Sequence, residues 1–252
     1  MLEIKNISAG YSKDTVLEGV NATITPGKLT SIIGINGSGK STLLKSILGI
    51  IPTRSGEILL DSHPLSSMSK NETAKRIAYL AQGRNTPDMT VEQLVLHGRF
   101  PYLSYPRRYT QRDREVAKKA METLGISALA EKHIATLSGG MRQNAYIAMA
   151  LAQDTDYILL DEPTTYLDVS HQIELMRTLQ KLSVNGKGIV TVMHDLPLAI
   201  KFADEMIVLN DKTVVAQTTP HELCRSSLIK EIFGISVAYE ENEQIFYYST
   251  RA

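Results

Sequence analysis

The stretch "GINGSGKST", Gly34 to Thr42, decides the fold of this chain. It matches the spacing GxxxxGK[ST], and it stands between the apolar run "LTSII" and the helix-like run "TLLKSILG". A strand, a glycine-rich turn and a helix in this order make a loop whose backbone N–H groups surround phosphate groups. The sequence therefore predicts a phosphate-binding loop at the carboxyl end of a strand.

The residues of this loop have different expected tasks. The glycines permit backbone angles that turn successive N–H groups inward. Lys40 is expected to reach the β and γ phosphates of a nucleotide as a catalytic point charge, and the Ser41 hydroxyl suits Mg²⁺. The expected nucleotide-binding residues are Gly34, Asn36, Gly37, Ser38, Gly39, Lys40, Ser41 and Thr42.

Two adjacent acids end a second apolar run, "YILLDEP". Such a run predicts a strand, so Asp161 and Glu162 should emerge at the carboxyl edge of the sheet, where α/β folds bind ligands. Asp161 suits a contact to Mg²⁺, direct or through water. Glu162 stands one residue further out, where it could polarise a water for in-line attack on the γ phosphate. Pro163 ends regular structure and keeps both acids near the edge.

His194 follows a third apolar run, "GIVTVM", and should project from the same edge. Because the carboxyl ends of parallel strands meet, we predict that His194 contacts the γ phosphate. The other five histidines lack the spacing of a metal pair and are expected on the surface or in loops.

Composition limits the remaining choices. At 252 residues and 43% hydrophobic content the chain can bury a large core. The 27 Lys and Arg balance the 27 Asp and Glu, which gives no reason to expect nucleic acid as a partner. Cys224 is the single cysteine, so an internal disulfide is excluded. The longest apolar runs have about five residues, far below the ~20 that span a bilayer, so any link to a membrane is expected through a partner.

The order of patterns predicts one domain with an inserted helical part. Strand and helix patterns alternate over about residues 1–86 and 156–252, as in a layered α/β core. Residues 87–155 look helical: Thr90 and Gln93 have capping-box spacing, and Val116, Ala120 and Leu124 recur every four residues until Gly125.

Taken together and in this order, the motifs resemble those of the ATP-binding cassette (ABC) ATPases, from Leu2 to about Gly234. The resemblance implies a P-loop NTPase (RecA-like) α/β core with an N-terminal antiparallel β-subdomain and an inserted α-helical subdomain. It implies ATP and Mg²⁺ as cofactors. By the same resemblance Tyr11 stacks on adenine with Val16 nearby, and Gln82 touches Mg²⁺ and the attacking water.

"LSGGMRQ", Leu137 to Gln143, matches the family's signature sequence. Ser138 is a suitable N-cap, and the amides of Gly139 and Gly140 would point at an anion. In the family that anion is the nucleotide of a second copy, so the resemblance implies a head-to-tail dimer in which each chain holds two half-sites. Asp168, at the end of "TYLD", matches the D-loop of the family.

The chain departs from the signature pattern at two positions. Met141 stands where many members have glutamine, and Asn144 where arginine is common. We expect activity to survive both departures.

The segments "TVEQLVLHGRFPYL" and "DEPTTYLDVSHQIELM" look most like importers of iron–siderophore complexes, vitamin B12 and haem. The resemblance implies a peripheral subunit at the cytoplasmic face of the cell membrane, bound to an integral membrane permease and served by a separate substrate-binding protein. Iron–siderophore import comes first, with vitamin B12, haem or another metal chelate as alternatives. A soluble ABC ATPase without transport is a further alternative, but such proteins generally carry two cassettes or a coiled coil.

The segment "RFPYLSYPRRYTQRDR" interleaves aromatic residues with five arginines, namely Arg99, Arg107, Arg108, Arg112 and Arg114. It could stack on single-stranded nucleic acid, but the neutral chain argues against that. In similar importers the region lies near the groove for the permease's coupling helix. A plain solvated loop is an equally good interpretation of the individual arginines.

Overall fold

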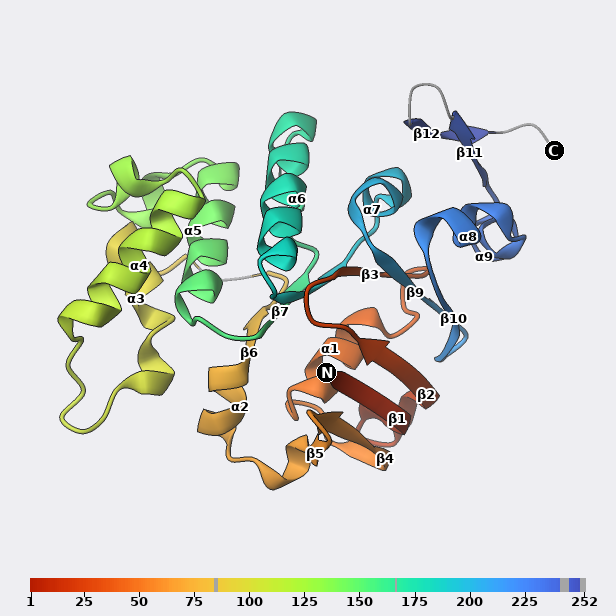
Figure 1. The fold of residues 1–252 in the computed structure, drawn as a ribbon, viewed down its shortest axis with the longest axis horizontal. Helices are drawn as coiled ribbons and strands as arrows, with labels where there is room; N and C mark the ends of the chain where they lie inside the picture. The colour runs from red at the N-terminus through yellow and green to blue at the C-terminus, as the bar shows by residue number, and fades with distance from the viewer. Residues whose placement is uncertain (84–85, 166, 241–244, 250–252) are drawn as a thin grey trace.

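Two sheets and the helices packed on them form the body of the protein (Figure 1). The computed structural model describes residues 1–83, 86–165, 167–240 and 245–249. The six-stranded sheet has the order β10-β9-β3-β8-β7-β6, in which neighbouring strands run parallel except for the antiparallel pair β9 and β10. Its strands are β3 (Leu29–Ile33), β6 (Ile77–Leu80), β7 (Tyr157–Asp161), β8 (Gly188–Val192), β9 (Glu205–Asn210) and β10 (Thr213–Thr218).

The central strands of this sheet are buried on both faces. Every residue of β3, β7 and β8 is buried. Successive residues point to opposite faces, so Ile158 joins one hydrophobic cluster and Leu159 the other. This confirms the expectation that continuous apolar runs form parallel strands with cover on both sides.

A smaller antiparallel sheet lies on one side of the larger one. Its order is β2-β1-β4-β5. Helix α1 (Lys40–Ile47) packs with both sheets, and Leu43, Leu44 and Ile47 share a cluster with residues of each. The strands are β1 (Leu2–Tyr11), β2 (Asp14–Ile24), β4 (Thr53–Leu60) and β5 (His63–Pro64).

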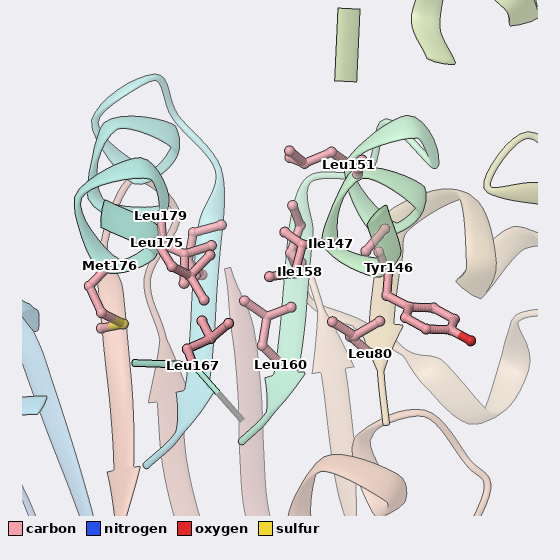
Figure 2. Packing of buried hydrophobic residues seen from close by; sticks show 14 of the residues in the cluster. Leu80, Tyr146, Ile147, Leu151, Ile158, Leu160, Leu167, Leu175, Met176 and Leu179 are labelled. Carbon is pink, nitrogen blue, oxygen red and sulfur yellow. The ribbon is translucent and has the colours of Figure 1, made fainter. Parts of the chain in front are cut away.

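Helices α5 (Gly139–Ala152), α6 (Val169–Val184) and α7 (Leu196–Phe202) cover the opposite face of the large sheet. Figure 2 shows Ile158 and Leu160 of β7 between Ile147 of α5 and Leu175 of α6. Burying each such side chain contributes roughly 1.5–3 kcal/mol. This packing fixes the position of α5 relative to the strands that carry the site.

A helical group at one end of the molecule contains α3 (Val91–His97), α4 (Gln111–Thr123) and α5, which contact one another (Figure 1). The capping box predicted for Thr90 and Gln93 is present at the start of α3. Of the stripe predicted for α4, Ala120 is buried and Leu124 packs partly buried against the core, while Val116 is half-buried. Ala117 and Met121 are also buried, so the apolar face is wider than predicted and is centred beside Val116. The predicted fold class is confirmed.

Sequence reading missed helix α2 (Lys70–Arg76), although Ser69 and Glu72 form a capping box at its start. The signal was available, but α2 has no buried residue and therefore no apolar period. Near the carboxyl end the chain forms further short elements, which are α8 (Pro220–Arg225), α9 (Leu228–Phe233), β11 (Ser236–Glu240) and β12 (Ile245–Ser249).

Candidate active site

The phosphate-binding loop joins β3 to α1 and approaches its neighbours closely. Gly39 has φ 100° and stands at the N-cap of α1. A Cβ at Gly39 would lie 2.7 Å from Leu17 Cδ2, and one at Gly34 would lie 2.2 Å from the carbonyl oxygen of Leu209. Side chains are therefore excluded at both positions.

Lys40 is buried at the first position of α1. Its Nζ donates to the carbonyl oxygens of Gly34 and Ile35, each at 2.9 Å. Burial lowers the pKa of this ammonium, and the charges of Glu162 and Asp161 oppose the shift. A desolvated cation in a glycine-rich loop at the start of a helix favours an anionic ligand.

Ser38 supports the same interpretation of the loop. Its side chain is buried, and among the described residues its Oγ has no hydrogen-bond partner. A buried hydroxyl without a partner costs about 1–3 kcal/mol, and a phosphate oxygen would satisfy it. The loop therefore fits a bound phosphate.

Asp161 ends β7 beside the loop. Ser41 Oγ donates to Asp161 Oδ1 at 2.9 Å, and the Tyr79 hydroxyl donates to Oδ2 at 3.3 Å. Burial raises the pKa of Asp161, while these two hydrogen bonds oppose the rise. A carboxylate and a hydroxyl are hard oxygen donors, so this pair fits Mg²⁺, which keeps several waters and shares substrate phosphates.

Glu162 lies at the centre of a small polar cluster. Gln82 Nε2 donates to its Oε2 at 2.6 Å, His194 Nε2 donates to its Oε1, and the Thr165 hydroxyl donates to Oε2 at 3.3 Å. The backbone of Glu162 is left-handed, with φ 53°. Such a conformation costs roughly 1–3 kcal/mol in a non-glycine residue and is concentrated at functional sites.

One cavity of about 650 Å³ brings most of the predicted residues together. Tyr11 is not one of its lining residues: it lies at the end of β1, with 48% of its surface exposed. The cavity is lined by Val16, Asn36, Gly37, Gly39, Lys40, Ser41, Thr42, Gln82, Glu162 and His194.

The signature residues lie outside that cavity. Ser138 caps α5 as predicted, and its Oγ accepts from the Met141 amide at 3.3 Å. Ser138 and Gly139 are exposed. Gly139 lines a second cavity of about 370 Å³, which shares Gln82 and Glu162 with the first.

Asp168 is the N-cap of α6. Its Oδ1 accepts from the backbone amide of His171 at 3.0 Å, from the Ser170 hydroxyl at 2.8 Å and from His171 Nδ1 at 2.8 Å. These bonds, led by the backbone one, lower the pKa of Asp168 to about 2. Asp168 therefore stays charged at every physiological pH.

The model of a protein family described as "ABC transporter" matches residues 17–165. This chain belongs to the ABC transporter family. As an ABC ATP-binding subunit it binds ATP and is an ATPase, which confirms the family resemblance and the predicted enzyme class.

Relatives of this ABC subunit cover nearly its whole length. It is 42% identical to the petrobactin import ATP-binding protein FpuD of Bacillus anthracis, over 92% of this chain and 86% of that one. It is also 42% identical to the ferric enterobactin transport ATP-binding protein FepC of Escherichia coli, with the same coverage of 92% and 86%. Among solved structures, a dimeric bacterial ABC transporter cassette is 29% identical with a TM-score of 0.76, over 87% of this chain and 99% of that one.

Sequence reasoning missed several residues that hold the ABC site in place. Thr165 and Tyr79 bond to the two acids, and Gln143 Nε2 donates to the carbonyl oxygen of Pro163 at 2.7 Å. The spacing of Thr165, three residues after Glu162, was a usable signal for a turn. For Tyr79 the chain offers no local signal, because its partner lies 82 positions away.

The arginine-rich segment, residues 99–114, is only partly exposed at the surface. Arg99 is 5% exposed, its Nε donates to Asp113 Oδ1 at 3.0 Å, and Nη1 donates to the carbonyl oxygen of Ala152 at 2.9 Å. It therefore joins α4 to the end of α5, and its guanidinium lies over the Tyr102 ring, 3.9 Å from the ring centroid, so Arg99 is not part of a solvated loop. Phe100, which lies under the Arg107 guanidinium, is exposed. None of the described helices is both long and apolar enough to cross a bilayer.

Proposed function

We propose that this ABC ATPase drives import of an iron–siderophore complex through an integral membrane permease, at the cytoplasmic face of the cell membrane. The similarity to FpuD and FepC, at 42% identity each, carries the choice of cargo. A substrate-binding protein delivers the cargo, and nucleic acid has no part. Vitamin B12, haem and other metal chelates are the alternative cargoes.

The cavity beside α1 is the proposed ATP half-site. Lys40 and the loop amides bind the β and γ phosphates, since the buried Lys40 and the glycine-rich loop line the cavity at the start of α1. Ser41 and Asp161 would hold Mg²⁺, with Gln82 beside it, and the ion would neutralise phosphate charge. Tyr11 and Val16 receive the adenine.

Glu162 is the proposed general base. Its carboxylate stands in the cavity, and Gln82 and His194 each donate to one of its oxygens. This arrangement fixes the carboxylate, so one oxygen can accept a proton from a water that attacks the γ phosphate in line. His194, which lines the same cavity, is the proposed contact to the γ phosphate.

The second half of each site comes from a second copy. Ser138 and Gly139 present the start of a 14-residue helix to solvent, and Gly139 lines a different cavity from Lys40. A head-to-tail dimer would place these groups and Asp168 against the partner's nucleotide. Closure on ATP and opening after hydrolysis would then move the permease.

The cargo is tested in cells that lack this chain but retain the permease and binding protein. Uptake of ⁵⁵Fe presented as a ferric siderophore should be lost, and wild-type protein should restore it whereas Lys40→Ala should not. Uptake of labelled vitamin B12 and haem serves as the control. If vitamin B12 or haem uptake falls while siderophore uptake stays normal, the proposed cargo is wrong.

A further inference from the structure

The side chain of Arg54 holds the turn between β1 and β2. Arg54 Nη2 donates to the carbonyl oxygens of Ser12 at 2.8 Å and Asp14 at 3.1 Å. Nη1 donates to the carbonyl oxygen of Lys13 at 3.2 Å and to Thr15 Oγ1 at 2.8 Å. One guanidinium therefore binds four consecutive residues, which are the two of the turn and the first two of β2.

This turn projects beyond the neighbouring strand. The register of β1 with β4 runs to Ala9 opposite Thr53, whereas its register with β2 continues to Tyr11 opposite Asp14. Ser12 adopts a left-handed backbone, with φ 46°. A two-stranded ribbon has little stability by itself, so the end of this hairpin depends on what holds it from outside.

The turn connects two residues of the proposed adenine site. Tyr11 precedes it, and Val16, which lines the ATP cavity, follows it. Val16 also lies against the phosphate loop, because a Cβ at Gly39 would come within 3.3 Å of Val16 Cγ1. The hairpin end is therefore held by the phosphate loop on one side and by Arg54 on the other.

We propose that Arg54 is a positioning residue for base recognition, which sets the turn so that Tyr11 and Val16 meet the adenine ring. This inference rests on the proposed function of the cavity. Arg54 acts through the turn, and the planar fork of its guanidinium matches several carbonyl oxygens at once. A lysine, with a point charge, cannot reproduce that pattern.

The test compares ATP, which carries the adenine ring, with triphosphate, which lacks it. Calorimetry on the full chain measures the binding of Mg·ATP and of magnesium triphosphate to wild type, Arg54→Ala, Arg54→Lys and Arg177→Ala, an exposed arginine of α6. Arg54→Ala should bind ATP about 3- to 10-fold more weakly, the size of a lost aromatic stacking contact, with triphosphate binding unchanged. Arg54→Lys should fall between wild type and Arg54→Ala, and Arg177→Ala should match wild type.

Two results would overturn the proposed role of Arg54 and leave the proposed function of the cavity standing. In one, Arg54→Ala weakens ATP and triphosphate equally, which indicates a general loss of structure. In the other, both affinities stay at the wild-type level. If wild type itself binds ATP no more tightly than triphosphate, then the adenine site proposed at Tyr11 is wrong, and the inference fails with it.

Discussion

Two helices of this protein begin beside glycines: α1 follows its N-cap Gly39, and α5 starts at Gly139. The two beginnings differ. Helix α1 starts inside the molecule, where Gly39 is left-handed, Lys40 is buried and the loop lines a cavity together with Glu162. Helix α5 starts at the surface, where Ser138 supplies an ordinary cap and Met141 is 48% exposed. In the proposed dimer the first helix start binds the nucleotide of its own chain, whereas the second faces the nucleotide of the partner.

The two beginnings are nevertheless connected. Gln143 of α5 donates to the carbonyl oxygen of Pro163, the residue after Glu162. A Cβ on Gly140 would lie 3.3 Å from Leu167 Cδ2, which belongs to the loop between the acids and Asp168. These contacts join the start of α5 to the segment that carries the proposed base. The predictions that follow separate the two helix starts, beginning with the largest effect.

Glu162→Gln tests whether the chemistry belongs to the cavity beside α1. Turnover should fall about 10²-fold or more, because an amide cannot accept the proton, while ATP binding stays. Steady-state ATPase rates and calorimetry measure the two properties. Glu174→Gln, an exposed acid on α6, is the control and should keep the wild-type rate. Wild-type turnover in Glu162→Gln would show that the base lies elsewhere.

Mixing Lys40→Ala with Ser138→Arg tests whether the start of α5 serves a second copy. Each variant alone should lose most of its ATPase activity. In an equal mixture half of the dimers are mixed, and each has one intact composite site, so about a quarter of the wild-type activity should return. ATPase activity as a function of the mixing ratio measures this. A mixture that stays inactive at every ratio would contradict head-to-tail sharing.

Ser138→Ala separates capping from nucleotide contact. Loss of the cap should lower the free energy of unfolding by about 1 kcal/mol. ATPase activity should fall about tenfold in addition, since a hydrogen bond to a charged phosphate is lost. Ser69→Ala, which removes a similar cap from α2, is the matched control. It should lower the free energy of unfolding and leave the ATPase activity unchanged. Equal ATPase rates in Ser138→Ala and Ser69→Ala would show that Ser138 acts only as a helix cap.

Met141→Gln has the smallest expected effect. The Met141 side chain is exposed, and its backbone amide donates to the Oγ of Ser138, the N-cap of α5. Neither feature depends on the identity of the side chain at position 141. The ATPase rate should change by about twofold at most, in line with exposed substitutions. A much larger gain, measured on purified protein, would mean that this side chain contacts the partner's nucleotide and that the departure from the family pattern tunes turnover.

Much of the site was predictable because its residues lie in short motifs. Gly34 to Thr42 is a local pattern, and the two acids and His194 each follow an apolar run that had to be a strand. Helix α2 was missed because it buries nothing, and Arg99 was misplaced because its buried partner, Asp113, is 14 residues away. The predicted division into residues 1–86, 87–155 and 156–252 stays a prediction about domain limits.

The sequence by itself determined the phosphate loop, the acids at the end of β7, the cap at Ser138 and the α/β class, since each depends on neighbouring residues and on hydrophobic period. Only the tertiary structure decided which residues meet. Parallel pairing of β7 with β6 and β8 brings Gln82, Glu162 and His194 into contact across 80 and 32 positions of the chain. The tertiary structure also placed Arg54 on the turn after Tyr11, because β4 pairs with β1. Such contacts arise from strand order and burial, which no local pattern encodes.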